Sequence, residues 1–432
     1  MMFRKMKRIL FTAAVLAVCF VLSVIYFVQL RPDVTVAGPA IMGDGIGRLA
    51  VDFMEAVYDD VNINFLSSRG SKIYLMDAPE RIIPLIKKNK GKRHQGKVLI
   101  YHDSLPTPDR KLPRCLRKLG SKTPNQIRIA YSMFESSRIP ESWVEILNNQ
   151  FDAVAVPDSF LVDVYQNSGV EIPIFVLPLG LHLDHFLEQP LKFSRNTPFC
   201  FVNTSVMVSR KNHIGLVRAF HQAFGDNPDV QLRMNYRYHA GSALQEVTDL
   251  IDSLNVHNMV MTGNKVSDAE YLNLLLKGDV FVTLSKGEGF SIQPREAMAL
   301  GYPVIISNNT AHTTIVNAGL ACGISCPTTE SAHITMLRCV SGDEYVADID
   351  EAAQALRAIY ENYDQELEHA AERRAWASTY QYSELKPLYL SLIKPSKIAL
   401  AEKNQITPET LFTNSTELYD KYIKLFKMDP PR

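Results

Sequence analysis

The sequence of 432 residues has few cysteines and no internal repeat or low-complexity segment. Its six cysteines are scattered, and the spacing of Cys322 and Cys326 is by itself too weak a pattern for a zinc site. No disulfide framework is therefore evident. Nothing in the composition indicates disorder, and a chain of this length is expected to form two domains rather than one.

The sequence also has no net charge, because 46 basic residues balance 46 acidic ones. The two signs are nevertheless separated along the chain. Residues 81–122 hold 13 basic and 2 acidic residues, whereas residues 341–372 hold 10 acidic and 1 basic. The first block is a candidate surface for anionic membranes, and the second is typical of an acidic helical face. We expect no nucleic acid partner.

One long apolar run lies near the N-terminus. Residues 9–30 form 22 uncharged, mostly apolar positions after a basic stretch at residues 4–8. Such a run can cross a bilayer, so we predict a single transmembrane anchor within residues 1–31. A cleaved signal peptide is the alternative, disfavoured by bulky residues where cleavage needs small ones. The basic flank favours a cytoplasmic N-terminus, which places the rest of the chain across the membrane.

Residues 278–307 combine a strand, a glycine-rich loop, a helix and a second strand. The apolar, β-branched run from Val280 to Leu284 is typical of a buried parallel strand. Pro294 suits the first helical position, and Gly301 suits the C-terminal cap. A helix that follows a strand and a glycine loop presents free N–H groups and a positive dipole end. This pattern therefore predicts a phosphate site.

Two carboxylates fall at this expected phosphate site, Glu288 in the loop and Glu296 in the first helical turn. Carboxylates do not bind phosphate, but they accept hydrogen bonds from hydroxyl groups. A ligand with a diphosphate between two polyols would satisfy both demands, and a nucleotide sugar is such a ligand. The alternative is a helix-capping acid beside a loop acid, since glutamate is common in first turns for dipole reasons.

The string from Glu288 to Glu296, EGFSIQPRE, continues as AMALGYPV and resembles the E-x7-E signature of the glycosyl transferases group 1 family. The resemblance implies a retaining glycosyltransferase with the α/β fold called GT-B, in which two Rossmann-like domains face a cleft. In this family the glutamate matching Glu288 contacts the donor sugar, and the one matching Glu296 binds the nucleotide ribose. Backbone N–H groups at Phe290, Ser291 and Ile292 are then expected to bind the donor phosphates.

The first half of the chain alternates strands with helices, which indicates a parallel sheet. A strand begins at Val34, and a glycine loop containing Gly45 and Gly47 opens the next helix. The resemblance implies that this loop faces the donor phosphates across the cleft, although such a loop is often only a tight turn. Loops of this kind carry little specificity on their own.

The strand predicted at residues 97–103 contains His102 at its end, where open α/β sheets place their ligands. The resemblance makes His102 a candidate catalytic residue that serves the acceptor hydroxyl. The alternative is a structural, hydrogen-bonded histidine. Glu135 follows another predicted strand, in a loop similar to an acid-containing loop of the family, and is a further candidate for the cleft.

Residues 209–212, with the sequence SRKN, precede a helical pattern in the second half. They resemble the basic loop of the family, whose lysine, here Lys211, binds the donor diphosphate, and Arg210 is expected to bind beside it. The usual earlier arginine of that loop is absent, so Lys211 and helix dipoles would neutralise more of the charge. The alternative is a solvated basic turn. Farther on, Ser267 and Glu270 match a capping box.

The resemblance covers roughly residues 34–390. It predicts an acceptor-side domain at residues 32–190, a nucleotide-sugar domain at residues 195–375, a return helix at residues 376–395 and a tail of unassigned role at residues 396–432.

Together these features predict a membrane-anchored enzyme that moves a sugar from a nucleotide-sugar donor to a glycan, lipid or protein acceptor. No Asp-x-Asp pair of the metal-dependent kind accompanies the motif, so we expect neither a metal nor a cofactor besides the donor substrate. The alternatives are a catalytically silent membrane scaffold with this fold and a sugar-nucleotide epimerase or glycogen-type synthase. The complete E-x7-E motif and Lys211 disfavour the scaffold.

Overall fold

The computed structural model describes residues 32–393, except for residues 43–44, 70–72, 76–77, 89–95, 107–116, 118–121, 265 and 335–336, and in addition residue 424. Within these ranges no helix is long and apolar enough to cross a membrane. The anchor predicted within residues 1–31, nearly all of the tail and half of the basic block lie outside the described residues.

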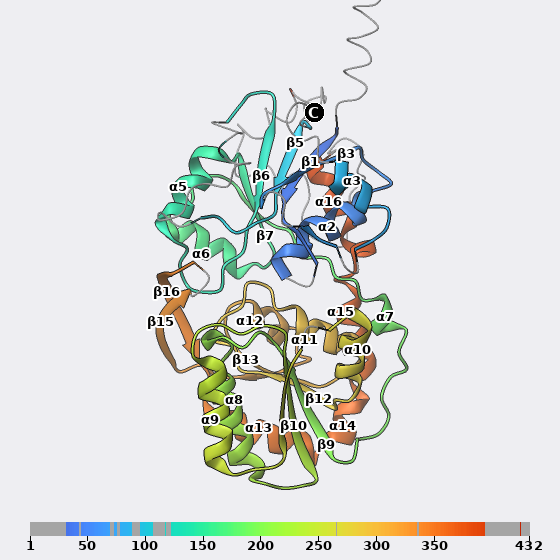
Figure 1. Ribbon diagram of the computed structural model, residues 1–432, viewed down its shortest axis with the longest axis vertical. Coiled ribbons are helices and arrows are strands. Elements are labelled where there is room, and N and C mark those ends of the chain that lie inside the picture. Colours follow the sequence, from blue (N-terminus) through green and yellow to red (C-terminus); the bar gives the residue numbers. More distant parts are fainter. Residues whose placement is uncertain are drawn as a thin grey trace, which may run out of the picture.

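The N-terminal half is built on a six-stranded parallel sheet with the order β3-β1-β5-β6-β7-β8 (Figure 1). Its strands are β1 (Val34–Gly38), β3 (Ile63–Ser67), β5 (Val98–Tyr101), β6 (Ile127–Tyr131), β7 (Ala153–Val156) and β8 (Ile174–Val176). The helices between them are α2 (Gly45–Val57), α3 (Ile83–Lys88), α5 (Glu141–Gln150) and α6 (Phe160–Ser168). Every position of β1, β5, β6 and β7 is buried, because helices cover both faces of the sheet. The predicted parallel sheet is confirmed.

A second six-stranded parallel sheet forms the C-terminal half, with the order β11-β10-β9-β12-β13-β14. The strands are β9 (Phe199–Thr204), β10 (Val230–Tyr236), β11 (Met259–Gly263), β12 (Val280–Thr283), β13 (Val304–Ser307) and β14 (Cys322–Ile324). The helices are α8 (His213–Phe224), α9 (Ala243–Leu254), α10 (Asp268–Leu276), α11 (Ile292–Ala299), α12 (Thr310–Asn317), α13 (Ile349–Glu361), α14 (Tyr363–Glu368) and α15 (Ala370–Ser378). The predicted capping box of Ser267 and Glu270 is confirmed at the start of α10.

The chain crosses between the two halves twice. It first passes down from β8 through the short helix α7 (Asp184–Leu187), and it returns after α15 as α16 (Tyr382–Ile393), which lies beside α2 (Figure 1). The Tyr389 hydroxyl donates to the carbonyl of Pro178 at 2.8 Å and accepts from the N–H of Gly180. A Cβ on Gly180 would lie 2.4 Å from the Tyr382 ring, so this crossing requires a glycine. The two crossings are therefore packed against each other.

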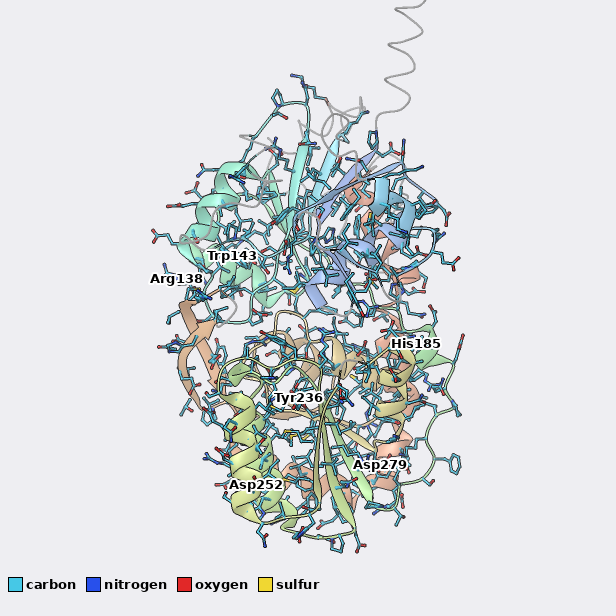
Figure 2. The ribbon with its side chains drawn as sticks, in the orientation of Figure 1. Arg138, Trp143, His185, Tyr236, Asp252 and Asp279 are labelled. Carbon is cyan, nitrogen blue, oxygen red and sulfur yellow. The ribbon has the colours of Figure 1, made fainter. Side chains whose placement is uncertain are left out.

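A β-hairpin that the sequence analysis did not predict joins the two halves at another edge. It consists of β15 (Thr328–Ile334) and β16 (Cys339–Val346), which pair in antiparallel fashion. Ser136 donates to the carbonyl of Ser341 at 2.6 Å, and Ser341 donates to the carbonyl of Arg138 at 2.8 Å. Leu337, between the strands, packs into the core of the N-terminal half. Figure 2 labels Arg138, which lies where the hairpin meets the N-terminal half.

Candidate active site

Both sheets bring their topological switch points to the boundary between the halves. In the C-terminal sheet the strand order reverses between β9 and β12, and in the N-terminal sheet between β1 and β5. Ligands of open α/β sheets bind outside the carboxyl ends of the strands at such points. The loops after β9 and β12 carry the basic residues and the first glutamate of the signature, so the candidate site lies there.

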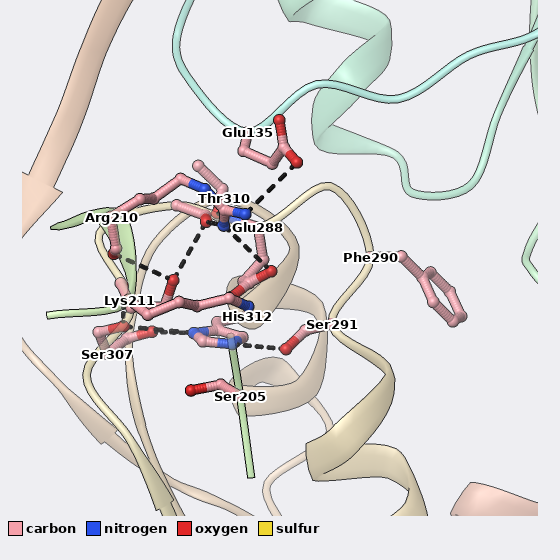
Figure 3. Close-up of polar contacts among 12 residues, drawn as sticks. Glu135, Ser205, Arg210, Lys211, Glu288, Phe290, Ser291, Ser307, Thr310 and His312 are labelled. Carbon is pink, nitrogen blue, oxygen red and sulfur yellow. Dashed lines mark hydrogen bonds and ion pairs between the residues drawn. The ribbon is translucent and has the colours of Figure 1, made fainter. Parts of the chain in front are cut away.

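Glu288 lies at the centre of a buried ionic cluster (Figure 3). Its carboxylate accepts a hydrogen bond from the Lys211 ammonium and lies 3.3 Å from Nη1 of Arg210. The Glu288 N–H also donates to the hydroxyl of Thr310 at 2.8 Å. Glu288 is 6% exposed and Lys211 is 8% exposed, so both charges lie away from bulk water. The structure thus brings together three residues that the sequence analysis named from loops 77 positions apart.

Electrostatics keep this cluster ionised. Burial by itself would raise the pKa of Glu288, but the charges of Lys211 and Arg210 outweigh it and hold that pKa well below its usual range. Burial lowers the pKa of the Lys211 ammonium, and the Glu288 carboxylate opposes this effect. Glu288 is therefore a carboxylate at neutral pH, and the cations are already oriented around one negative charge.

The loop between Glu288 and α11 has a special backbone conformation. Ser291 has φ of 66°, in the left-handed region, and the helix begins directly after it at Ile292. The prediction that Pro294 is the first helical residue was wrong. The turn at Ser291 starts the helix two residues earlier, and Pro294 is tolerated within a first turn whose N–H groups need no intrahelical partner. Phe290 is buried and points away from the ionic cluster, as Figure 3 shows.

His312 holds the side chain of Ser291 from behind the loop. Its Nδ1 lies 3.0 Å from the carbonyl oxygen of Ser307, which can only accept, so Nδ1 carries the proton. Its Nε2, 2.8 Å from Oγ of Ser291, then accepts from that hydroxyl. Burial lowers the pKa of His312 to about 4, so the ring is neutral at neutral pH. His312 was not predicted from the sequence, because no motif marks it.

Glu296 occupies a different environment. The prediction that it lies in the first helical turn was wrong, because α11 begins at Ile292 and its first turn holds no acidic residue. The Glu296 carboxylate accepts a hydrogen bond of 2.6 Å from the hydroxyl of Tyr271, which also lies 3.3 Å from the Thr204 hydroxyl. Burial raises the pKa of Glu296, while the Tyr271 hydrogen bond and the charge of Arg48 partly oppose this. Tyr271 was also missed by the sequence analysis, which predicted its helix but no role for its hydroxyl.

The predicted glycine loop of the N-terminal half lies within α2, which begins at Gly45. A Cβ on Gly45 would meet no other atom within 4 Å, whereas Gly47 is buried. Arg48, the next residue, donates to Asp52 at 2.8 Å and feels the charge of Glu296. Since Glu296 belongs to the other half, the start of α2 lies across the boundary from the signature helix.

His102 lies directly after β5 and is only 2% exposed. Its ring packs between those of Phe53 and Tyr131, with centroid distances of 4.9 and 5.1 Å. Neither ring nitrogen has a hydrogen-bond partner among the described residues, and burial lowers its pKa to about 3. His102 is therefore a neutral imidazole beneath the sheet edge, and no described contact joins it to Glu288.

Glu135 brings the N-terminal half into the ionic cluster. Its carboxylate lies 3.5 Å from Nη2 of Arg210, across the boundary between the halves (Figure 3). The loops approach so closely that a Cβ on Gly287 would lie 1.9 Å from the carbonyl oxygen of Glu135. Any residue other than glycine at position 287 would push the loops apart.

Two further residues of this boundary, Arg295 and Asp158, were missed by the sequence analysis. Arg295 stands inside the signature directly before Glu296, where its charge resembles that of an ordinary solvated residue, so no sequence signal pointed to its burial. Asp158 follows β7, at the ligand-binding edge of the N-terminal sheet. Within the described part of the chain, no group of three or more His, Cys, Asp or Glu side chains could hold a metal ion.

Residues 188–368 match the model of a sequence family described as Glycosyl transferases group 1. The predicted resemblance to this family is confirmed over these residues, which include Lys211, Glu288 and Glu296. A search of curated protein sequences found no significant match to the chain.

Solved structures confirm the fold at low sequence identity. A sucrose-phosphate synthase from Thermosynechococcus elongatus has a TM-score of 0.60 and 15% identity, over 84% of this chain and 98% of its own. HepE from Anabaena, crystallised in complex with UDP, has a TM-score of 0.59 and 12% identity, over 84% of this chain and 99% of its own. A glycosyltransferase from Rickettsia africae has a TM-score of 0.59 and 16% identity, over 84% of this chain and 97% of its own. These similarities are to the GT-B fold.

Proposed function

We propose that this protein is a glycosyltransferase that moves a sugar from a nucleotide-sugar donor to a glycan, lipid or protein acceptor with retention at the anomeric carbon. The observation that carries the proposal is the buried cluster of Lys211, Arg210 and Glu288 at the switch point of the C-terminal sheet. The match to group 1 glycosyl transferases and the UDP bound in HepE support it.

Within the donor site, glycosyl transfer requires stabilisation of negative charge more than it requires proton transfer. The reaction breaks the bond from the anomeric carbon to a diphosphate oxygen and forms one to an acceptor oxygen. It releases nucleoside diphosphate and a proton. Negative charge grows on the departing diphosphate, where Lys211, Arg210 and the N–H groups of the loop before α11 would stabilise it. Lys211 needs no reorganisation, because Glu288 already orients its ammonium.

The two signature glutamates have separate roles in this proposal. Glu288 accepts hydrogen bonds from hydroxyl groups of the donor sugar, beside the cations that bind the diphosphate. Glu296 accepts bonds from the ribose hydroxyls in place of the bond that it now accepts from Tyr271. The exchange at Glu296 replaces one neutral donor with another, so it requires no net movement of charge.

A panel of nucleotide sugars and nucleoside diphosphates, titrated into the full-length protein, tests this function. Because relatives of this fold bind UDP, we expect uridine nucleotides to bind first. Release of nucleoside diphosphate only when an acceptor is present would identify a transferase, whereas release of an isomerised donor would identify an epimerase. No binding by any member of the panel would refute the proposal and favour a scaffold.

We further propose that the reaction needs no divalent metal, because Lys211, Arg210 and loop N–H groups can neutralise the diphosphate. The activity should persist after dialysis against a chelator. Loss of activity that magnesium or manganese restores would refute this metal independence.

We also propose a membrane anchor within residues 1–31, with the N-terminus in the cytoplasm. The apolar run of residues 9–30 and its basic flank support this orientation. A reporter fused after Arg432 should be active only on the far side of the membrane. Activity confined to the cytosol would reverse the orientation.

A further inference from the structure

Arg295 is the largest of the fully buried side chains among the residues that the structure describes. It lies on α11 between the two signature glutamates and is 0% exposed. A guanidinium remains charged at any ordinary pH, and burying that charge is costly unless it is paired. Replacing a buried ion pair with an apolar side chain is often neutral or stabilising. A role in packing alone therefore does not explain a charged residue here.

The guanidinium holds the loop on which the donor phosphates are expected. Nη1 of Arg295 donates to the carbonyl of Ser291 at 2.9 Å and also to the carbonyl of Phe290. In a trans peptide the C=O and the following N–H point in opposite directions. Drawing these two carbonyls inward therefore directs the N–H groups of Ser291 and Ile292 away from Arg295. It also stabilises the left-handed φ of 66° at Ser291, which is otherwise unfavourable.

Aromatic rings fix the guanidinium in this position. Its central carbon lies 3.9 Å from the ring centroid of Phe290 and 4.6 Å from that of Tyr380, with Trp376 at 5.7 Å. These rings favour a cation over their faces and leave Arg295 little freedom to swing away. The loop carbonyls are therefore held by a group that is itself immobilised.

The other end of the guanidinium faces the N-terminal half. Nη2 of Arg295 lies 3.6 Å from Oδ2 of Asp158, which is too long for a hydrogen bond. Nε and Nη2 have no hydrogen-bond partner within the described ranges. Asp158 is 3% exposed, and its other oxygen accepts a hydrogen bond of 2.8 Å from Thr314, again across the boundary. Nη2, a buried donor without a partner among the described residues, thus faces a buried carboxylate just beyond hydrogen-bond distance.

We propose that Arg295 is a positioning residue that sets the phosphate-binding N–H groups before α11, and that Asp158 completes this arrangement when the halves approach. A small closing movement would bring Asp158 within hydrogen-bond distance of Nη2. Domain closure and loop geometry are then coupled through one guanidinium. This inference rests on the proposed function, since it assigns Arg295 to the same donor site.

The test compares Arg295→Met with Arg373→Met in the full-length protein, using the nucleoside diphosphate that binds the wild type. Arg373 is a matched control, because it is also buried and bonds the carbonyls of Leu320 and Glu366 outside the site. We expect Arg295→Met to weaken nucleotide binding by about tenfold, while Arg373→Met changes it less than about twofold. Equal affinity in wild type and Arg295→Met would overturn the inference while leaving the proposed function intact.

Asp158→Asn separates closure from loop geometry. The asparagine can still accept from Thr314 but no longer carries the charge that attracts Arg295. We expect nucleotide affinity to stay within about twofold of wild type while turnover falls by about tenfold. Unchanged turnover would remove Asp158 from the proposal.

Hydrogen exchange of the amides at residues 289–292 provides a readout without ligand. It should quicken in Arg295→Met and not in Arg373→Met, and equal rates would overturn the positioning role even if affinity were affected. Should Arg295→Met fail to fold, Arg295→Lys takes its place, because lysine keeps the charge but lacks the planar fork. If the wild type binds no nucleotide at all, the proposed function itself fails, and this inference fails with it.

Discussion

Glu288 and Glu296 come from one loop and helix, yet the structure gives them opposite environments. Glu288 is held by two cations, which keep its pKa below the usual range. Glu296 is held by a neutral tyrosine hydroxyl, and burial raises its pKa. A negatively charged ligand group must bind Lys211 and Arg210 alongside Glu288. A ligand hydroxyl group can instead take the place of the Tyr271 hydroxyl as the hydrogen-bond donor to Glu296. The two carboxylates are therefore prepared for different parts of one ligand.

The largest expected effect is that of Glu288→Gln. Turnover should fall by about 100-fold or more, because the site loses a charge aligned with the reacting sugar. Lys211 would remain buried without its counter-charge, and the half-buried Arg210 would keep only Glu135, so the free energy of unfolding should fall by about 3 kcal/mol. A bound nucleoside diphosphate should restore much of that loss by supplying negative charge.

Steady-state kinetics and thermal unfolding with and without nucleotide measure these quantities. Glu366→Gln is the control, since Glu366 pairs with Arg373 away from the site. Normal turnover in Glu288→Gln would remove Glu288 from the reaction.

The pH dependence of stability should distinguish the two glutamates by sign. The carboxylate of Glu288 stabilises the fold above the ordinary pKa of 4.5, and this stabilisation is lost as the pH falls below it. For Glu296, whose pKa is raised, stability is greatest below 4.5 and is lost as the pH rises through the raised value. Denaturant unfolding between about pH 2 and pH 7 should therefore show the stability of Glu288→Gln approaching that of the wild type as the pH falls below 4.5, and the stability of Glu296→Gln rising relative to the wild type at high pH. Parallel curves for both variants would refute the contrast.

A smaller effect is expected on nucleotide binding in Glu296→Gln. If Glu296 accepts bonds from both ribose hydroxyls, binding of the nucleoside diphosphate should weaken by about 1 to 3 kcal/mol. Turnover at saturating donor should change less than in Glu288→Gln. Isothermal titration calorimetry measures the affinity, and an undisturbed Kd would mean that Glu296 serves only the hydrogen bond with Tyr271.

Tyr271→Phe should have the smallest effect. It removes the hydroxyl that Glu296 now uses, so the free energy of unfolding should fall by about 1 kcal/mol and the pKa of Glu296 should rise further. Nucleotide affinity should stay within about threefold, because the ribose hydroxyls take over the same carboxylate. Tyr363→Phe is the matched control, since its hydroxyl bonds the Asp279 carbonyl away from the site. A large loss of affinity in Tyr271→Phe alone would indicate that Tyr271 itself contacts the ligand.

Features that depend on short stretches of chain could be predicted from the amino-acid sequence alone. Buried strands such as β5 and β12 show as apolar runs, and the capping box of α10 shows in four residues. The same holds for Lys211, Glu288 and Glu296, since a loop before a helix N-terminus is a local pattern. Hydrophobic periodicity and the proline, glycine and capping residues at element ends reflect local backbone preference, so these features could be predicted without knowledge of distant contacts.

Contacts between distant residues, in contrast, depend on how the whole chain folds. The hairpin of β15 and β16 is defined by its docking on the other half, and residues 77 positions apart form the bond between Lys211 and Glu288. The pairing of Arg295 with Asp158 and the burial of His102 depend equally on how the two halves pack. Charge, burial and hydrogen bonding act over ångströms in space, whereas sequence spacing gives no measure of that distance. The sign of each pKa shift therefore became known only once the neighbours of each group were in place.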